Sequence, residues 1–567
     1  MRHRYWPLGV PHALRVPQVP LGHFVDVAAQ RYPDKAAIIY GGATLSYAQL
    51  SQQVQAVAAY LQQRLGVQHG DRVLVISQNC PQFVVGYLAI LQAGAAAVPV
   101  NPMSTAPELR YFIQDSGARV AIVAQELLRT ALACVTDDGQ PGLDALLVHA
   151  YSDALSAERG VAASDALPEV VTAPRLPLNH PACHGFQDAL ACASVFQAVK
   201  VGPDDLCVLP YTSGTTGHPK GCMHTHRTVL ASNIGSQQWR GLHAEAVFLC
   251  VAPLFHMLGM QNGMNMPLTL GATMVMMPRW NPVLAIQLIE RHRVSVWTAP
   301  PAMVIDLFAQ PQAQQHDLSS LSLLSGGGAA MPEAVAAMLA ERFGLTYNEA
   351  YGLTETAAFL HANPLKRGKR QCLGLPTQGV ESRIVDPVTL AELPQGEVGE
   401  LVTTGEQLMR GYWRNEAANR DAFFERDGKR FFRTGDLASV DEDGYFFLRD
   451  RLKRMIAVSG YKVWPAEVES ALYEHPAIHE ACIIGLEDAQ KGELVKALVV
   501  LKPSSAGTVS PQDIIDWSRQ RMAVYKAPRL VEIVPSLPKS ATGKIMWREL
   551  QEAARHAQAG HSTSGTA

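Results

Sequence analysis

The sequence predicts an α/β protein: a large N-terminal domain of doubly wound sheets with a small β-barrel-like unit, followed by a small α+β C-terminal domain. Three observations predict it. The 567 residues exceed what one hydrophobic core organises. Strand-like apolar runs alternate with helix-like segments up to residue 123 and again after residue 207. From residue 380 short strands separated by turn residues take over, and helices and strands alternate again after a charged run at 449–454.

The first part of the chain has the clearest alternation. Ser46 suits the N-cap of an amphipathic helix, and Gly41-Gly42 suits the turn between two strands. Helices are expected at 24–32, 47–64 and 109–115, and strands at 36–40, 72–77 and 120–123.

The most apolar stretch, Phe83 to Val100, has the length of a membrane span. Gly94 and Pro99 interrupt it, so we expect a buried helix that ends near Gly94 and then a short strand. The Ala-rich residues 124–200 predict a peripheral region with a helix or two, to which we assign no chemistry.

The remaining elements follow the same rules. Proline at 332 suits a helix start, because its missing N–H does no harm there. Helices are expected at 227–234, 283–292, 465–473 and 511–522, and strands at 246–252, 272–277, 295–299, 321–325, 380–385, 399–403, 445–448, 481–485, 496–502 and 530–533.

Composition excludes some classes of function. With 48% hydrophobic and 17% charged residues and a formal net charge of −3, the chain gives no case for nucleic-acid binding, so local clusters must meet any polyanionic ligand. Nine scattered cysteines without CxxC spacing favour a reducing compartment, and no signal peptide is expected, so we predict a cytoplasmic protein. His180 and His184 flank Cys183, but a surface loop is favoured over a metal site.

The stretch from Tyr211 to Gly221 holds hydroxyls, glycines and one lysine directly after the apolar run 207–209. Glycines let backbone N–H groups approach a ligand closely, and successive N–H groups form a concavity that suits phosphate oxygens. Lys220 adds a positive charge. Hydroxyl donors come from Thr212, Ser213, Thr215 and Thr216. The stretch therefore predicts a phosphate-binding loop.

Two other interpretations of residues 211–221 are less favoured. The spacing is not that of a Walker A loop, because Gly217 is followed by His218-Pro219-Lys220-Gly221 rather than by Lys-Ser/Thr. A flexible Ser/Thr/Gly linker is disfavoured, since linkers seldom follow a buried strand and end in Pro-Lys-Gly.

Six motifs in order over almost the whole chain give a resemblance to a known family. They are Tyr211–Gly221, Gly327-Gly328-Ala329, Tyr351-Gly352-Leu353-Thr354-Glu355, Thr434-Gly435-Asp436, Asp450-Arg451-Leu452-Lys453 and Pro538–Ile545. Together they resemble the adenylate-forming superfamily, which includes acyl-CoA synthetases, luciferase and the adenylation domains of peptide synthetases.

The resemblance implies two half-reactions at one site, with ATP, coenzyme A and a carboxylic acid as substrates and Mg²⁺ as the ion. A carboxylate attacks the α-phosphate of ATP, pyrophosphate leaves, and a thiol then attacks the acyl-adenylate and releases AMP. It also implies a large domain over 1–449, a hinge at 450–454 and a mobile α+β C-terminal domain over 455–555. Residues 556–567 are expected to be a disordered tail.

The resemblance also implies roles on the phosphate side. Lys220 would hold the β- and γ-phosphates together with Thr212, Ser213, Gly214, Thr215, Thr216 and Gly217. Glu355 would bind Mg²⁺, which prefers carboxylate and phosphate oxygens, and Thr354 would contact the α-phosphate. Lys544 would bridge the carboxylate and the phosphate and stabilise the transition state.

On the nucleoside and acyl sides, Asp436 and Arg451 would bind the ribose, His256 would gate the carboxylate pocket and Lys453 would be the hinge. The adenine pocket would be formed by Gly327, Gly328, Ala329, Glu349, Ala350, Tyr351 and Gly352, with Tyr351 stacked on the ring. The pair Glu349-Ala350 departs from the Gln-Gly of many relatives.

Each assignment has a plainer alternative. His256 could be a core histidine, and Lys453 could be an ordinary linker residue. Asp436, Glu355 and Lys544 could be a turn residue, a solvated acid at a helix start and a surface lysine, respectively.

The acid is predicted from the expected acyl pocket at 235–240, 256–266, 299–303, 326–328 and 352–361. Methionines crowd it, and Met suits an apolar, flexible ligand, so we predict a medium- or long-chain fatty acid; Met packed as simple core is the alternative. These stretches carry no obvious cation for a second carboxylate. An aromatic acid such as a benzoate or cinnamate is the alternative substrate, and a separate carrier protein is the alternative acceptor.

The sequence sets few limits on assembly. No transmembrane segment is expected, although peripheral membrane contact would suit a fatty substrate. A monomer or a homodimer is expected.

Overall fold

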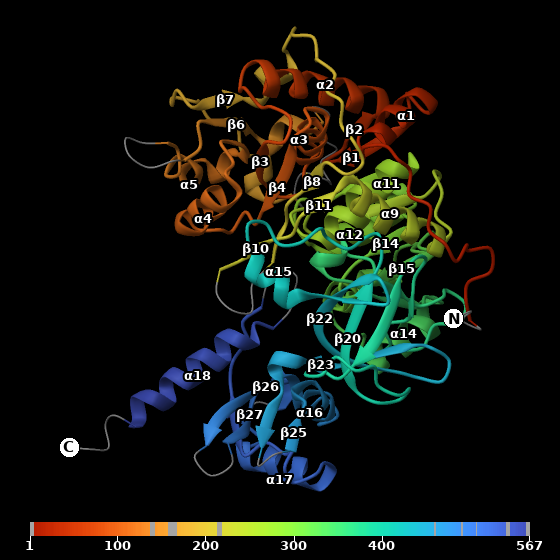
Figure 1. Ribbon diagram of the computed structural model, residues 1–567, viewed down its shortest axis with the longest axis vertical. Helices are drawn as coiled ribbons and strands as arrows, with labels where there is room; N and C mark the ends of the chain where they lie inside the picture. Colours follow the sequence, from red (N-terminus) through yellow and green to blue (C-terminus); the bar gives the residue numbers. More distant parts are fainter. Residues whose placement is uncertain are drawn as a thin grey trace. The chain divides into compact units, whose positions relative to one another are not determined.

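The computed structural model describes the backbone of residues 5–136, 142–156, 167–212, 218–458, 461–488, 492–505, 507–539 and 545–562 (Figure 1). Side chains are described for these residues except Lys453, Tyr461, Lys462, Ser504 and 559–562. The chain forms two compact units: Met1–Glu381 with Thr404–Arg430, and Ser382–Thr403 with Phe431–Ala567.

The first unit contains a seven-stranded sheet in the order β11-β8-β4-β3-β5-β6-β7, parallel except between β8 and β11. Its strands are β3 (Arg72–Ile76), β4 (Ala96–Val100), β5 (Val120–Ala124), β6 (Ala145–His149), β7 (Cys183–Gly185), β8 (Leu206–Val208) and β11 (His224–Thr225). Short helices accompany it: α4 (Ala106–Ser116), α5 (Leu128–Leu132), α7 (Glu169–Thr172) and α8 (Phe186–Leu190).

The same unit contains a nine-stranded sheet in the order β18-β17-β16-β15-β14-β12-β13-β1-β2, parallel from β16 to β1. Its strands are β1 (Ala36–Tyr40), β2 (Ala43–Ser46), β12 (Val247–Cys250), β13 (Thr273–Met276), β14 (Val296–Thr298), β15 (Leu323–Gly326), β16 (Tyr347–Tyr351), β17 (His361–Ala362) and β18 (Leu375–Pro376). Its helices include α1 (His23–Arg31), α9 (His226–Arg240), α12 (Pro282–His292), α13 (Pro301–Ala309) and α14 (Glu333–Phe343).

Two helices lie between these sheets. Buried residues of α2 (Tyr47–Gln63) and α3 (Pro81–Gln92) share one core with inward-facing residues of β1 and β13 on one side and of β3 and β5 on the other. Separate cores cover the outer faces, one with α12–α14 and one with α4 and α5. The unit is therefore layered helix–sheet–helix–sheet–helix, the doubly wound arrangement that the alternation predicted.

The second unit begins with antiparallel strands. They are β19 (Glu381–Val385), β20 (Gly399–Thr404), β22 (Lys429–Val440) and β23 (Phe446–Arg451); β20 and β23 both pair with β22. A compact α+β part follows, in which β26 (Ile478–Asp488) pairs along its length with β27 (Gly492–Leu501). Its other elements are β24 (Ile456–Val458), β25 (Tyr461–Val463), α16 (Pro465–Leu472), α17 (Pro511–Arg521), β28 (Leu530–Ile533) and α18 (Trp547–Ser562).

The apolar stretch 83–100 folds as expected, as the buried helix α3 and the buried strand β4. Among the described residues, no helix is long and apolar enough to cross a bilayer. Two expectations were wrong. Residues 124–200 hold two sheet strands, β6 and β7, and His184 lies in β7 rather than in a loop, with Nδ1 3.0 Å from the Tyr60 hydroxyl.

The end of the chain also differs from expectation. Helix α18 continues to Ser562, past residue 556, where the disordered tail was predicted to begin. Apolar positions in the first half of α18, such as Trp547 and Leu550, pack against the buried face of β26 and β27, and the helix continues past them.

Candidate active site

The glycine motif and the Tyr351 motif lie side by side in the first unit. Strands β15 and β16 are parallel neighbours, with Gly326 paired to Glu349, so 326–329 and 349–354 leave the sheet at the same edge. Ligands bind at this edge in open α/β sheets. A Cβ on Gly327 would lie 2.1 Å from the Ala350 carbonyl oxygen, so only glycine fits there. Gly328 and Ala329 are exposed.

Glu349 has a structural task at this edge. Its two carboxylate oxygens accept the backbone N–H groups of Met331 (2.9 Å) and Cys372 (3.1 Å), and burial raises its pKa. Its side chain therefore fixes the segment after the glycines. Tyr351 is buried, with its ring 5.7 Å from that of His361, and Ala350 and Gly352 flank it, half-buried.

The predicted phosphate-binding stretch forms a hairpin. Strands β9 (Tyr211–Thr212) and β10 (Lys220–Gly221) are antiparallel, with Lys220 opposite Thr212. The Tyr211 hydroxyl donates to Asp115 Oδ2 (2.5 Å) and anchors the hairpin at its base. The predicted residues Ser213, Gly214, Thr215, Thr216 and Gly217 lie outside the described residues, between the two strands.

Tyr412 joins the predicted phosphate lysine to the predicted magnesium ligand. Lys220 Nζ lies 4.2 Å from the centre of the Tyr412 ring, a cation–π distance. The Tyr412 hydroxyl donates to Glu355 Oε1 at 2.9 Å. Tyr412 is 5% exposed, and burial beside Glu355 raises its pKa, so it stays a protonated donor. The sequence reasoning missed Tyr412; the aromatic pair Tyr412-Trp413 after a glycine was its available signal.

Backbone contacts hold these groups in register. The backbones of Cys222 and Tyr412 pair as an isolated antiparallel β-bridge. The Met409 N–H donates to the Glu355 carbonyl oxygen (2.9 Å). The His224 ring lies 2.7 Å from the Thr354 carbonyl oxygen through Nε2. Burial lowers the pKa of His224 to about 4, so the ring is neutral and donates this bond. Thr354, Glu355 and Lys220 are thus brought together.

Magnesium is implied by the resemblance, and the donors suit it. Mg²⁺ keeps several waters and is bound by one or two carboxylates plus substrate phosphates. Glu355 is half-buried, and the described residues contain no group of three His, Cys, Asp or Glu that would form an all-protein cage. One carboxylate beside a phosphate-binding hairpin fits this ion.

His256 begins a short irregular helical segment of the first unit. Its Nδ1 accepts the Leu258 N–H (3.3 Å) and caps α10 (Met257–Gly259), which continues into the π-helix η3 (Met260–Asn265) and then α11 (Met266–Leu270). π-Helical turns are frequent at functional sites. Gln261 donates to the Val229 (3.0 Å) and Ala357 (3.2 Å) carbonyl oxygens, which ties this segment to α9 and to the segment after Glu355.

Arg240 contradicts the expectation that the acyl pocket carries no obvious cation. It lies within the expected acyl pocket, at the last residue of α9, and it is a cation only 7% exposed. It was missed because an arginine in the last turn of a helix usually faces solvent.

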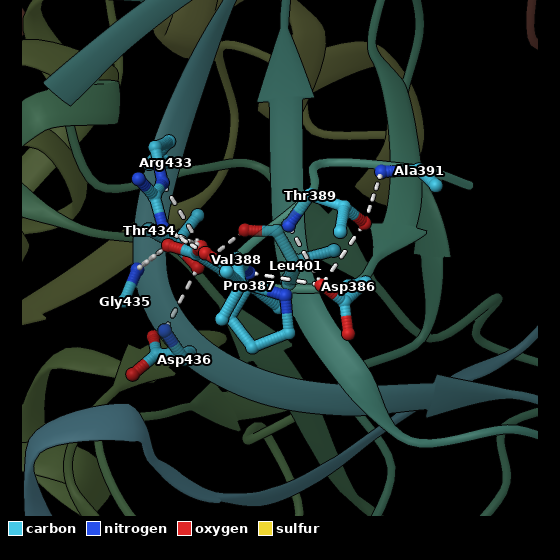
Figure 2. Close-up of polar contacts among 11 residues, drawn as sticks. Asp386, Pro387, Val388, Thr389, Ala391, Leu401, Arg433, Thr434, Gly435 and Asp436 are labelled. Carbon is cyan, nitrogen blue, oxygen red and sulfur yellow. Dashed lines mark hydrogen bonds and ion pairs between the residues drawn. The ribbon is translucent and has the colours of Figure 1, made fainter. Parts of the chain in front are cut away.

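In the second unit, Asp436 lies in a bulge of β22, where the register with β20 shifts between Glu400 and Val402 (Figure 2). The Thr434 hydroxyl donates to the Leu401 carbonyl oxygen (2.7 Å) and accepts the Asp436 N–H (3.1 Å). Arg451 Nε lies 2.7 Å from Asp436 Oδ1, so the two predicted ribose residues meet as an ion pair.

The side chains of Arg433 and Glu400 also brace this bulge. Arg433 donates to Glu400 Oε2 through Nε (3.0 Å) and Nη2 (2.6 Å), and Nη2 also donates to the Pro387 carbonyl oxygen (2.9 Å), as Figure 2 shows for the turn after Asp386. Glu400 Oε1 accepts the Gly435 N–H (3.2 Å). The side chain of Asp436 is 1% exposed, while that of Arg451 is 45% exposed.

The predicted hinge lies next to a buried ion cluster. Asp450 accepts the N–H groups of Arg451 and Ala466 (2.6 Å each), which fixes the start of α16, and burial raises the pKa of Asp450. Arg454 pairs with Glu469. The Lys453 side chain and the whole of Lys544 lie outside the described residues.

Comparisons with known proteins show the family to which the chain is similar. The AMP-binding enzyme family matches residues 25–413, and the AMP-binding enzyme C-terminal domain matches residues 467–544. A long-chain-fatty-acid–CoA ligase of Bacillus subtilis is 33% identical over 96% of this chain and 97% of its own. A feruloyl-CoA synthase of Amycolatopsis sp is 33% identical over 94% and 98%. A solved anthranilate CoA ligase with anthranoyl-AMP superposes with TM-score 0.81 at 28% identity, covering 96% and 99%.

The chain belongs to the AMP-binding enzyme family. Within that family it is an AMP-forming acyl-CoA synthetase of the adenylate-forming superfamily, with ATP and coenzyme A as substrates and Mg²⁺ as the usual ion. The family and the fold are those that the six motifs predicted.

Proposed function

We propose that this enzyme joins a medium- or long-chain aliphatic acid to coenzyme A and that the site residues named above carry the reaction. The observation that supports it most directly is the link from Lys220 through Tyr412 to Glu355 beside the hairpin. It holds a cation and a carboxylate together where a polyphosphate and its metal need both. Phosphoryl-type substitution depends on such positioning and charge more than on covalent help.

The division of labour follows from the chemistry of each group. Lys220 and Thr212, with Ser213–Gly217, would bind the β- and γ-phosphates, and Glu355 would hold Mg²⁺, which neutralises phosphate charge when bound. Asp436, an acceptor-only group, and Arg451 would bind the ribose. The edge at 326–329 and 349–352 would receive the adenine.

The chain's own groups then act on the acid. A carboxylate oxygen attacks the α-phosphorus and pyrophosphate leaves; Lys544 would offset the repulsion between the two anions. In the second step the thiol sulfur attacks the acyl carbon and AMP leaves. His256 would control access between the steps. In this proposal residues 1–449 form the large domain, 450–454 the hinge and 455–555 the mobile C-terminal domain. Lys453 would be the hinge residue.

The acid class rests on two supports. Met257, Met260, Met264 and Met266 are all buried along the segment that follows His256. The first three pack in the core around α2 and α3, as simple core packing expects, and Met also adapts to a flexible apolar ligand. The Bacillus relative acts on long-chain fatty acids by its name. An aromatic acid is the second candidate, favoured by the feruloyl-CoA synthase relative at the same identity.

We also propose a cytoplasmic monomer or homodimer that touches membranes peripherally when its substrate is fatty. All nine cysteines are free thiols, which suits a reducing compartment. Light scattering in solution and co-sedimentation with anionic lipid vesicles test assembly and membrane contact.

Substrate-dependent ATP–pyrophosphate exchange tests the proposed activity. Octanoate and palmitate should support fast exchange, acetate slow exchange and benzoate less than octanoate, with CoA-dependent thioester and AMP following in equal amounts. Fastest exchange on benzoate would end the fatty-acid assignment. Lys544→Ala should fold and bind ATP but lose most exchange; a full exchange rate in that variant would remove its assigned role.

A further inference from the structure

Arg240 is a buried cation that the reaction described above does not use. It ends α9 and is 7% exposed. Its Nη1 donates to Asn262 Oδ1 at 2.9 Å, and its Cζ lies 5.2 Å from the centre of the Phe359 ring. Burial lowers the pKa of Arg240 to about 10, which leaves it charged at neutral pH.

This guanidinium has no acidic partner among the residues that the structure describes. Arg454, whose side chain is 13% exposed, has such a partner, because it pairs with Glu469. A buried charge is costly unless it is paired and hydrogen-bonded, and an amide oxygen with an aromatic face satisfies few of the five N–H donors. An anion brought by a bound ligand would pair this charge.

Two other segments of the expected acyl pocket contact Arg240. Asn262 lies in the π-helix η3, six residues after His256, and Phe359 follows Glu355 along the chain. Tyr347, close enough to Arg240 to influence its pKa, donates its hydroxyl to the Ala299 carbonyl oxygen (2.9 Å). A Cβ on Gly326 would lie 2.4 Å from that hydroxyl, so the adenine edge is adjacent.

The placement along the helical segment sets a scale. At the rise of an α-helix, the six residues from His256 to Asn262 span roughly 9 Å, and a π-helical turn shortens this. Arg240, bonded to Asn262, is thus linked to a point about that far along the segment from His256, which suits the distal end of an acid whose reacting carboxylate would lie at His256.

We propose that Arg240 is a specificity-determining residue that binds an oxygen function at the distal end of the acid, most strongly a second carboxylate. The inference rests on the proposed acid–CoA ligase function and names the preferred substrates within it: ω-carboxylated or otherwise ω-oxygenated acids are used better than acids of the same length that end in a methyl group. The planar guanidinium offers parallel N–H donors that match a carboxylate, and it can reach a distal phenol or carbonyl oxygen by one donor.

Matched pairs of acids test this inference. kcat/KM for AMP formation is measured with octanoate and octanedioate, and with cinnamate and 4-hydroxycinnamate, in the wild type, Arg240→Met and Arg240→Lys. The wild type should favour octanedioate over octanoate by at least tenfold. Arg240→Met should reduce that ratio by at least tenfold or reverse it, and Arg240→Lys should fall between, since it keeps the charge and loses the fork.

Arg291→Met is the matched control, because Arg291 also lies in the last turn of a helix but is exposed. It should leave every ratio unchanged. A second readout covers poor folding of Arg240→Met: octanedioate with a non-hydrolysable ATP analogue should raise the melting temperature of the wild type more than octanoate does, and not that of Arg240→Lys to the same extent.

The outcomes separate the two proposals. If no acid in either pair yields AMP, the proposed function fails. If octanoate is activated as well as octanedioate and Arg240→Met leaves the ratio unchanged, the function stands and the role of Arg240 is overturned. A larger preference for 4-hydroxycinnamate than for octanedioate, lost in Arg240→Met, would keep Arg240 as the oxygen-binding residue and assign the aromatic class.

Discussion

Two cations of the first unit lie against aromatic rings, and their surroundings differ. Lys220 is half-buried over Tyr412, whose hydroxyl reaches Glu355. Arg240 is buried beside Phe359, with an amide oxygen as its hydrogen-bond acceptor. One cation is joined to a carboxylate through a single phenol; the other has no carboxylate among the described residues.

The difference separates chemistry from specificity. On the proposed assignments, the cation that would hold every nucleotide is half-buried and linked through Tyr412 to the proposed metal ligand. A cation that must select among acids is desolvated, so its free energy depends strongly on what the acid brings. Substitutions on the phosphate side should therefore affect all acids equally, and those on the acyl side should not.

The largest effect is expected from Lys220→Met. Removing a preorganised charge from the phosphates should lower kcat/KM for ATP by about 10²- to 10³-fold, by the same factor with octanoate and with octanedioate. Pyrophosphate exchange with each acid measures it. Lys366→Met, which alters an exposed lysine, is the control. A loss that differs between the two acids would place Lys220 on the acyl side and break the comparison.

Glu355→Gln should come next. The amide keeps the size and an acceptor for the Tyr412 hydroxyl but removes the charge that a divalent ion requires. Half-saturation by Mg²⁺ should rise about ten- to a hundredfold at saturating ATP, since a lost metal ligand typically costs affinity of that order. Activity titrated with Mg²⁺ measures it, with Glu333→Gln at an exposed site as the control. An unchanged Mg²⁺ requirement would refute the assignment of Glu355.

Tyr412→Phe tests the link between these two residues. The ring under Lys220 remains, while the 2.9 Å hydrogen bond to Glu355 is lost. A hydrogen bond to a charged group is worth about 1.5–3 kcal/mol, so a roughly tenfold rise in Mg²⁺ half-saturation is expected, with little change in KM for the acid. Tyr412→Leu, which also removes the ring, should raise KM for ATP further. Equal behaviour of the two variants would show that the ring does not support Lys220.

Residues that act through backbone geometry could be predicted from the sequence. Gly327 must be glycine because a Cβ would meet the Ala350 carbonyl oxygen, and such a demand leaves a glycine-rich signature after a strand. Ser46 and Gln49 form the predicted cap of α2, a local pattern over four residues. Local constraints are written in consecutive residues, which explains why the alternation predicted the layers correctly.

Residues that act through distant packing could not be predicted. Tyr412 meets Lys220 and Glu355 only because the bridge at Cys222 joins distant parts of the chain. Arg240 has the position of an ordinary exposed helix-end charge, and its burial depends on η3 and Phe359. Strand β6 is fully buried, with four apolar residues before His149, and periodicity alone does not distinguish so short an apolar run from a buried helix.

The smallest effect on activity is expected at His149, a buried histidine that differs from His224 in its hydrogen bonding. The described residues include no hydrogen-bond partner for either ring nitrogen of His149, and burial lowers its pKa to about 3, whereas His224, with its pKa lowered to about 4, bonds to the Thr354 carbonyl oxygen. Between these folded-state pKa values and 6.5, each of the two histidines binds protons more fully in the unfolded chain than in the folded chain. The free energy of unfolding should therefore rise with pH across that window and be lost as the pH falls.

His149→Phe removes the buried imidazole without removing a hydrogen bond. At pH 5 a pKa near 3 in the folded state and 6.5 in the unfolded state corresponds to about 2 kcal/mol of lost stability relative to pH 7, and the variant should not lose it. Chemical unfolding at pH 5 and 7 measures the difference, while exchange activity at pH 7 should stay near that of the wild type. His224→Phe should flatten the same pH dependence but also reduce exchange, because Thr354 loses its anchor on the phosphate side. Equal activity of both variants would show that His224 does not position Thr354.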